Sequence, residues 1–355
     1  MKKKILVAPL DWGLGHASRC IPIINSLIEL GAEVVLAADG DPMLMLKKAF
    51  PDLRCIQLKG YPIRYPLRMP FGVYFAMRFP AMQRMIRWEH AQLKWLQQKE
   101  KFDAVISDNR YGLFLNSVPS VIITHQLQLM YTPLSGLLKR IIKARLSPFN
   151  AVWVPDIEGE HNLSGQLSHG IDAHAAIKFI GPLTHFIADP IPIREIKYDL
   201  LVLLSGPEPH RTILENKLIQ QIMPLDDKVL LVSGQAEKEL DTHHREHFRQ
   251  LSFLSTEQLQ RCILQSDTII ARSAYSSIMD LAFLKKKALL IPTTGQAEQM
   301  YLANYLKSKK WFFTSDEQSL NLKEQIQETR EYRCPLAEDV FCQHKKVLED
   351  WLKAI

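Results

Sequence analysis

The sequence has few cysteines, and their spacing argues against a disulfide framework or a zinc site. Five cysteines are scattered over 355 residues, and none forms a Cys-x-x-Cys pair. An odd and dispersed set of this kind is typical of reduced thiols in the cytosol. We therefore expect a protein of a reducing compartment, without a cysteine-bound metal.

Long hydrophobic runs are also missing. No stretch approaches the ~20 consecutive apolar residues of a membrane-spanning helix. The basic start, Met-Lys-Lys-Lys, precedes a short apolar run that leads directly into a glycine-rich turn. This pattern predicts a first β-strand and not a signal peptide, so we expect a cytoplasmic protein.

A strong charge of one sign is lacking as well. The formal net charge is +6, which fits anionic ligands or an anionic membrane surface but is too dispersed to predict nucleic-acid binding. Apolar residues make up 47% and charged residues 23% of the chain, as in ordinary soluble globular proteins. The length is comfortable for two domains.

The glycine-rich turn near the N-terminus lacks one part of a dinucleotide-binding motif. Gly13 and Gly15 follow the first apolar run, but Ser18 stands where the third glycine of G-x-G-x-x-G would be. The strand, turn and following helix predict the first unit of a doubly wound sheet, with its ligand at the carboxyl ends of the strands. His16 in this turn suggests proton transfer; the alternative is a histidine that only caps the turn.

Apolar β-branched runs then alternate with helical patterns and turns along the chain, which predicts an α/β fold. Prolines cluster between 182 and 194, and strand and helix signals then start again. The sequence therefore predicts two Rossmann-like domains facing each other across a cleft. The expected divisions are residues 1–181, a linker at 182–195, a second domain at 196–335 and a C-terminal helix at 336–355.

The string Gly13-x-Gly15-His16-x-x-Arg19 resembles the N-terminal motif of GT-B glycosyltransferases. It is most similar to the family of the peptidoglycan N-acetylglucosaminyltransferase, whose donor is UDP-N-acetylglucosamine. Arg19 departs from that family and resembles a related nucleotide-sugar hydrolase. The resemblance implies a GT-B fold whose C-terminal helix crosses back to the first domain, a UDP-linked sugar as donor, and no cofactor or metal.

The resemblance also implies roles for residues of the first domain. His16, alone or with Asp108 at the end of a predicted strand, would act as the base that activates an acceptor hydroxyl. Arg19 and His125 would contact the acceptor, whose identity stays open and which could be linked to a lipid.

Donor binding would fall mainly on the second half of the chain. The strongest segment runs from Arg272 to Asp280, where hydroxylated residues open a helix able to bind a diphosphate and an acidic residue could accept from ribose. It differs from the family pattern at Ala274, and Pro207 removes a backbone donor from an earlier loop. The predicted donor-binding residues are Gly13, Gly15, Ser205, Gly206, Leu254, Arg272, Ser273, Ser276, Ser277, Asp280, Glu298 and Gln299.

Two further patterns mimic metal sites. Asp39-Gly40-Asp41 imitates a DxD motif, but it follows a strand and is typical of turn and helix-capping chemistry. His243, His244 and His247 lie among charged residues, and we interpret them as a solvated face.

The segment 61–95 interleaves aromatic residues with arginines. It predicts either an acceptor-binding or peripheral contact at the inner face of the cell membrane, or a long amphipathic helix packed on the first sheet with solvated arginines.

Three functional hypotheses follow. The first is an inverting, metal-independent glycosyltransferase. The second keeps the fold and uses water as the acceptor, as a nucleotide-sugar hydrolase. The third is a sugar-nucleotide-binding protein with a degenerate site, which the replaced glycines at Pro207 and Ala274 favour.

Overall fold

The computed structural model describes residues 2–60, 71–128, 135–169, 176–187, 195–206, 208–235 and 239–355. The chain divides into two compact units, of which one comprises Met1–His185 with Ala337–Ile355 and the other Phe186–Leu336. The predicted divisions at 181 and 335 lie within a few residues of these limits. Most of the predicted linker, from 188 to 194, lies outside the described residues.

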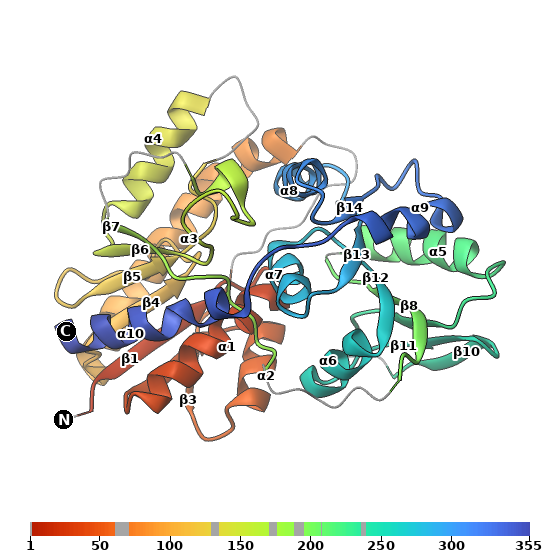
Figure 1. Cartoon of the computed structure of the whole chain (residues 1–355). Helices are drawn as coiled ribbons and strands as arrows, with labels where there is room; N and C mark the ends of the chain where they lie inside the picture. The colour runs from red at the N-terminus through yellow and green to blue at the C-terminus, as the bar shows by residue number, and fades with distance from the viewer. Residues whose placement is uncertain are drawn as a thin grey trace. The chain divides into compact units, whose positions relative to one another are not determined.

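The first unit is built on a parallel sheet (Figure 1). Its order is β3-β2-β1-β4-β5-β6-β7, and every neighbouring pair is parallel. The strand order changes direction between β1 and β4, where sheets of this type bind ligands beyond the strands' carboxyl ends. The strands are β1 (Lys4–Pro9), β2 (Glu33–Ala38), β3 (Arg54–Gln57), β4 (Ala104–Asp108), β5 (Ser120–Ile123), β6 (Ala151–Val154) and β7 (Ala176–Phe179).

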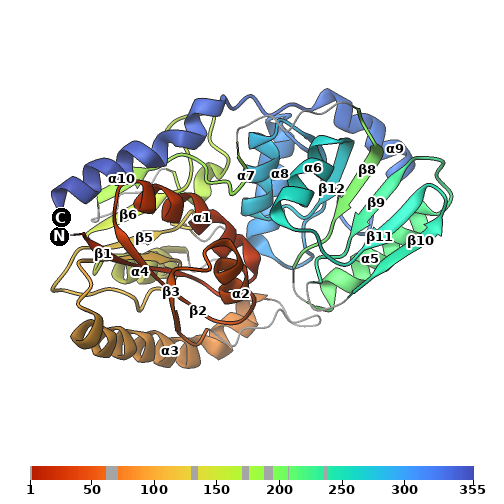
Figure 2. The same cartoon turned by 90° about the horizontal axis from the view of Figure 1, so that it is seen from below.

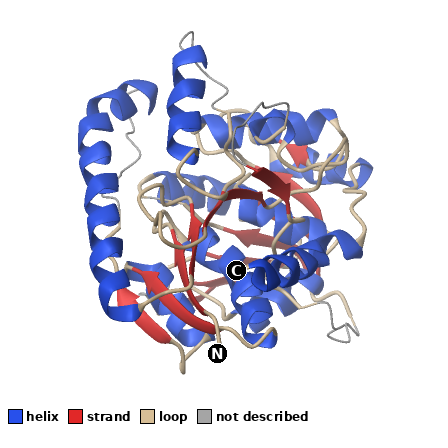
Figure 3. Ribbon diagram, turned by 90° about the vertical axis from the view of Figure 1, so that its left-hand side faces the viewer, coloured by secondary structure: helices blue, strands red, loops and turns tan. Residues whose placement is uncertain are grey.

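Helices lie on both sides of these strands (Figure 3). Ile5, Leu6 and Val7 in β1 are fully buried, because a parallel sheet covered on both faces requires apolar residues at successive positions. The C-terminal helix α10 packs against α1 in this unit (Figure 2). The helices are α1 (Leu14–Glu29), α2 (Gly40–Ala49), α3 (Phe71–Glu100), α4 (Ser135–Leu146) and α10 (Gln343–Ala354), with short 3-10 turns at Gly165–Leu167 and Glu338–Cys342.

The second unit repeats this architecture with the strand order β10-β11-β9-β8-β12-β13-β14. All neighbouring pairs are parallel except β10 and β11, which form a hairpin. The strands are β8 (Tyr198–Leu203), β9 (Val229–Val232), β10 (Asp241–Arg245), β11 (Phe248–Leu251), β12 (Ser266–Ala271), β13 (Lys287–Leu290) and β14 (Phe313–Thr314). The helices are α5 (His210–Ile222), α6 (Thr256–Leu264), α7 (Tyr275–Phe283), α8 (Ala297–Ser308) and α9 (Leu322–Glu328), with a 3-10 turn at Thr329–Glu331.

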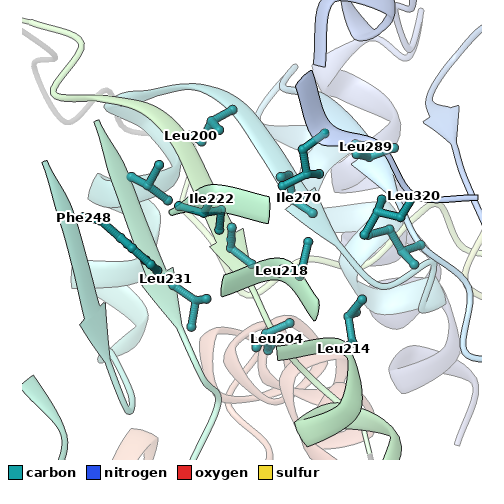
Figure 4. Close-up of a cluster of buried hydrophobic side chains, with 14 of the residues drawn as sticks. Leu200, Leu204, Leu214, Leu218, Ile222, Leu231, Phe248, Ile270, Leu289 and Leu320 are labelled. Atoms are coloured by element: carbon teal, nitrogen blue, oxygen red, sulfur yellow. The ribbon is translucent and has the colours of Figure 1, made fainter. Parts of the chain in front are cut away.

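The core of the second unit explains why its helices stay on the sheet. Leu214, Leu218 and Ile222 recur every four residues along α5 and are buried against apolar side chains of the strands (Figure 4). Spacing of three to four residues places such side chains on one face of a helix. Burial of each contributes about 1.5–3 kcal/mol, so this face fixes the helix to the sheet.

The hairpin corrects part of one interpretation of the sequence. His243, His244 and His247, which were interpreted as a solvated face, lie in and between β10 and β11. His244 Nε2 lies 2.6 Å from Gln250 Oε1, and His247 Nε2 lies 2.9 Å from the carbonyl oxygen of Leu225. Two of the three imidazoles are therefore engaged within the unit, while His243 is exposed.

Candidate active site

Helix α1 begins directly after the glycine-rich turn, and this start places His16 at the end of β1. Gly13 precedes the helix with a φ of 91°, a left-handed conformation that favours glycine. His16 and Arg19 then lie three residues apart on α1, and residues at this spacing share one face of a helix. The glycine-rich turn and the start of α1 thus place the imidazole of His16 and the guanidinium of Arg19 side by side.

Asp108 reaches this point from the neighbouring strand. It ends β4 in register with Pro9, and its carbonyl oxygen accepts from the backbone N–H of Leu10 at 3.0 Å. Its carboxylate is fully buried and forms an ion pair with Arg19. Arg19 Nε donates to Asp108 Oδ2 at 2.6 Å, and Arg19 Nη2 donates to Oδ1. Two charge-assisted hydrogen bonds therefore hold the carboxylate.

His16 shares both of these partners through one ring nitrogen. Its Nδ1 lies 3.3 Å from each carboxylate oxygen of Asp108 and 2.8 Å from Arg19 Nη2. The side chain is 15% exposed, whereas those of Asp108 and Arg19 are buried. Arg19 Nη1 also lies 3.3 Å from His125 Nδ1, and His125 follows the end of β5. The structure thus brings together four predicted residues of the first domain.

The electrostatics of this cluster follow from burial and from the Arg19 charge. Burial lowers the pKa of His16, and the neighbouring guanidinium lowers it further against the opposing effect of Asp108. Burial alone would raise the pKa of Asp108, but the charges of Arg19 and His16 outweigh it and bring that pKa to about 2. His16 is therefore neutral and Asp108 ionised at neutral pH.

The contacts that the structure shows for Arg19 lie within the cluster. Arg19 is only 3% exposed, and its N–H groups are directed at Asp108, His16 and His125. The side chain thus acts on its neighbours within the cluster. A direct contact with an acceptor, for Arg19 and equally for the buried His125, stays a prediction.

Sequence reasoning missed a second buried ion pair beside this cluster. Arg110, two residues after Asp108, donates from Nε to Glu89 on α3 at 2.6 Å, and both side chains are fully buried. It also donates to the carbonyl oxygen of Lys59 at 2.7 Å and, more weakly, to those of Leu58 and Pro9. Arg110 therefore ties α3 and the chain after β3 to the strand ends that carry His16 and Asp108. In the sequence, only the position of Arg110 shortly after a strand marks this residue, and nothing there points to Glu89 as its partner.

In the second unit, the predicted phosphate segment lies where β12 leads into α7. Ser276 and Ser277 are half-buried in the first turn of α7, and the residue before the helix, Ala274, makes no side-chain cap. The first N–H groups of a helix lack partners within it, so this turn offers donors to an anion. Asp280 lies one turn further along α7 and is half-buried.

Three of the predicted donor residues are engaged inside the unit instead. Arg272 is 1% exposed; it pairs with Glu317 and donates from Nη2 to the carbonyl oxygen of His210 at 2.9 Å. Ser273 donates to the carbonyl oxygen of Gln299 at 2.9 Å, and Gln299 Oε1 accepts from the N–H of Thr293 at 2.9 Å. These side chains shape the loops after β12 and β13, and direct contact with a donor stays a prediction for them.

The remaining predicted donor residues are more accessible. Glu298, in the first turn of α8, and Leu254 are half-buried, while Ser205 and Gly206 are exposed. Pro207, whose effect on the loop was part of the sequence argument, lies outside the described residues. Leu254 precedes α6, which begins with a capping box formed by Ser255 and Gln258.

Over the described part of the segment 61–95, the amphipathic-helix reading fits the packing. Ile86 and Leu93 on α3 are buried, whereas Arg84 and Arg87 are exposed. Residues 61–70, with Arg64 and Arg68, lie outside the described residues. Within the described chain, no helix is long and apolar enough to cross a membrane. Nor do its His, Cys, Asp and Glu residues gather into a group of three suited to a metal ion.

Comparison with known proteins matches part of the chain to a family. Residues 210–353 match the glycosyltransferase family 28 C-terminal domain. No curated protein matches the chain.

Solved structures of glycosyltransferases share the whole fold. CalG4, the calicheamicin glycosyltransferase, aligns with a TM-score of 0.68 at 12% identity, covering 100% of this chain and 98% of that one. SnogD from Streptomyces nogalater aligns with a TM-score of 0.64 at 14% identity, covering 100% and 98%. The spinosyn rhamnosyltransferase SpnG, complexed with thymidine diphosphate, aligns with a TM-score of 0.62 at 12% identity, covering 99% and 96%.

These likenesses confirm the predicted fold class, an α/β GT-B architecture of two Rossmann-like domains. At such low identity the structural likeness shows the fold alone. The family match bears on the activity, because it covers the segments of α7 and α8 in which the donor site was predicted. Together they support a glycosyltransferase of the GT-B type.

Proposed function

We propose that this chain is an inverting glycosyltransferase that moves a sugar from a UDP-linked donor to an acceptor oxygen without a metal ion. The family 28 match over residues 210–353 is the observation that carries this proposal. The peptidoglycan N-acetylglucosaminyltransferase, which the N-terminal motif resembles, is one example of an enzyme with this activity. The structural relatives include proteins complexed with thymidine diphosphate and dTDP, so dTDP-sugars are tested beside UDP-sugars.

The donor half of the reaction is proposed for the second unit. The first turn of α7 would receive the diphosphate, because its N–H groups have no partner within the helix and the helix dipole favours negative charge. Asp280 would accept from the ribose and Glu298 from the sugar, since each follows the carboxyl end of a parallel strand. A preorganised set of donors at the leaving diphosphate would stabilise the charge that develops there.

The acceptor half is proposed for the first unit. His16 is the partly exposed member of a buried polar cluster at the ends of β1 and β4. In a single displacement, the acceptor oxygen attacks the anomeric carbon while the bond to the diphosphate breaks. Inversion follows from attack opposite to the leaving group. His16 would contact the acceptor oxygen, and Asp108 and Arg19 would set the state of its ring.

Calorimetric titration with UDP and UDP-N-acetylglucosamine tests the donor site. Asp280→Ala should weaken both ligands by roughly five- to a hundredfold, whereas Glu298→Ala should weaken only the UDP-sugar. Glu324→Ala, an exposed carboxylate on α9, is the matched control and should change neither. Equal losses at Glu298 would show that the sugar is misplaced. Unchanged binding in both variants would remove the donor site from this unit.

The nucleotide-sugar hydrolase remains the second candidate. Arg19 is the residue of the N-terminal motif that resembles the hydrolase, and it contacts His16. A binding protein without turnover is the third. Release of free sugar without an acceptor would favour the hydrolase, and ligand binding without turnover across an acceptor panel would favour the third.

We further propose a peripheral contact of the segment 61–95 with an anionic membrane surface on the cytoplasmic side. The exposed Arg84 and Arg87 on α3 support it. Replacing both by Glu should reduce sedimentation with phosphatidylserine vesicles, whereas Lys309→Glu with Lys310→Glu makes the same charge change in the second unit as a control. If the wild-type protein does not sediment, or both pairs behave alike, the membrane contact is refuted.

A further inference from the structure

The contacts of His16 conflict with its use as a base, and the conflict lies at one atom. To accept a proton from an acceptor through Nε2, a neutral imidazole has to carry its own proton on Nδ1. In that state Nδ1–H would donate to Asp108, which lies 3.3 Å away. However, Arg19 Nη2 lies closer, at 2.8 Å from the same nitrogen.

Arg19 can only donate, since a guanidinium has five N–H groups and no acceptor. If Nδ1 also carried a proton, two N–H donors would face each other at 2.8 Å. The arrangement is consistent only when Nδ1 is bare and accepts from Arg19. The ring then holds its single proton on Nε2.

The carboxylate offers little competition for that proton. Both oxygens of Asp108 already accept from Arg19, through Nε at 2.6 Å and through Nη2. Cys20 Sγ adds a weak contact to Oδ2 at 3.7 Å. Because a paired carboxylate is largely neutralised by its guanidinium, Asp108 cannot draw a proton to Nδ1 as an unpaired one would.

The other groups that the described residues place at this cluster do not restore a base. Arg19 and Cys20 come from α1, Asp108 from β4, and His125 from the end of β5, where its Nδ1 also faces an Arg19 N–H at 3.3 Å. Tyr111, whose hydroxyl pKa is raised by burial, lies near enough to feel the charges of Asp108 and Arg19. None of these groups is a carboxylate free of the guanidinium.

We propose that Arg19 is a positioning residue that fixes the Nε2–H tautomer of His16, so that this site takes its acceptor as an anionic oxygen, a carboxylate or a phosphate. The substrate part of this inference rests on the proposed transferase function. His16 donates from Nε2 to the acceptor and orients it. The anionic oxygen forms the new bond to the anomeric carbon, the bond to the nucleoside diphosphate breaks, and no proton has to be removed. A neutral alcohol or water would find no base in His16, so this proposal also counts against the hydrolase.

The tautomer can be read directly from the wild-type protein. Long-range ¹H–¹⁵N correlation spectra of the ¹⁵N-labelled full chain distinguish Nε2–H from Nδ1–H, and the signals lost in His16→Gln assign the ring. We expect the Nε2–H pattern at neutral pH. An Nδ1–H pattern, or a doubly protonated ring, overturns the proposal without any assay of activity.

Two variants separate positioning from general structure. Arg19→Met leaves Asp108 as the only charged partner of His16 Nδ1, so the ring should gain an Nδ1 proton and its pKa should rise. Cys20→Ala, on the same helix and in contact with Asp108 but not with His16, should leave the pattern unchanged. If Arg19→Met folds and keeps Nε2–H, Arg19 does not fix the tautomer. If it does not fold, the wild-type spectrum still decides.

The acceptor class is tested with benzoate and phenyl phosphate against benzyl alcohol. Titrated into the labelled protein without donor, the two anions should shift the His16 Nε2 signal and the alcohol should not. With UDP-N-acetylglucosamine or dTDP-glucose as donor, transfer to the anions should exceed transfer to the alcohol by about tenfold or more. Preference for the alcohol overturns the acceptor class. Binding of the anions at His16 without any binding or turnover of either donor would instead overturn the proposed transferase function.

Discussion

Two side chains, Arg19 and Asp108, meet one ring nitrogen of His16 and decide what the ring can do, and the sequence showed only part of this arrangement. His16 and Arg19 lie three residues apart on a predicted helix, so their contact could have been expected. Asp108 ends a neighbouring strand and was proposed as a partner of His16. The ion pair between Arg19 and Asp108 was not foreseen, because it depends on side-chain conformations and on register between β1 and β4.

The ion pair of Arg110 with Glu89 lies beyond sequence reasoning altogether. The two residues come from a loop and from α3, and neither position shows a periodic signal that connects them. Burial of both side chains is a property of the packed unit. Pairs of this kind are costly to break and hold local geometry more than they add stability.

Loss of the ion pair between Arg110 and Glu89 should lower the free energy of unfolding. Arg110→Met should destabilise the protein by about 3–5 kcal/mol, because it leaves the buried Glu89 carboxylate without this guanidinium. Adding Glu89→Leu should recover part of the loss, since no buried charge then remains. Urea unfolding of the two variants and the wild type measures the difference. A cost below about 1 kcal/mol for Arg110→Met would show that the pair is not a buried charge pair in solution.

At the scale of helices and strands, the sequence predicted the buried strands, because their apolar runs are easily recognised. The alternation of apolar β-branched runs with helices is present in both units: the run 33–38 is β2, and apolar runs of the second unit are β8, β9, β12 and β13. The hairpin of β10 and β11 was missed because its residues are polar and rich in histidine, which hides the period-two pattern. Its pairing with β9 stabilises it instead.

The C-terminal helix α10 carries a titratable group whose burial makes stability depend on pH. Burial lowers the pKa of His344 from 6.5 to about 4, and the charge of Lys345 adds to this. Between these values the unfolded chain binds a proton that the folded chain does not. Stability from this group is therefore complete above pH 6.5 and falls by up to roughly 3 kcal/mol as the pH drops toward 4.

His344→Leu tests this by removing the titrating ring. Denaturant unfolding of variant and wild type between pH 4 and 7 should show a smaller fall in stability for the variant. Other groups titrate in both proteins, so the difference between the two curves is the relevant quantity. Curves that run parallel across the whole window would contradict the assignment.

For the whole molecule, the order of motifs along the chain predicted more than any single motif. A glycine turn with a histidine, a second series of strands, and a hydroxylated helix start in the right sequence led to the GT-B fold. The family match covers the second part of this series. The sequence could not show that Arg272, Ser273 and Gln299 are engaged within the second unit, since their partners come from other loops.

The central claim is that the chain transfers a sugar from a nucleotide donor with the help of His16. The most direct test measures release of the nucleoside diphosphate by the full chain. The donors are UDP-N-acetylglucosamine and dTDP-glucose, each with and without the acceptors benzoate and phenyl phosphate. The account predicts release that depends on an acceptor and falls by about a hundredfold in His16→Ala, because the acceptor loses the group that orients it, while donor affinity stays within a few fold. Equal release without an acceptor, or undiminished release by His16→Ala, would contradict it.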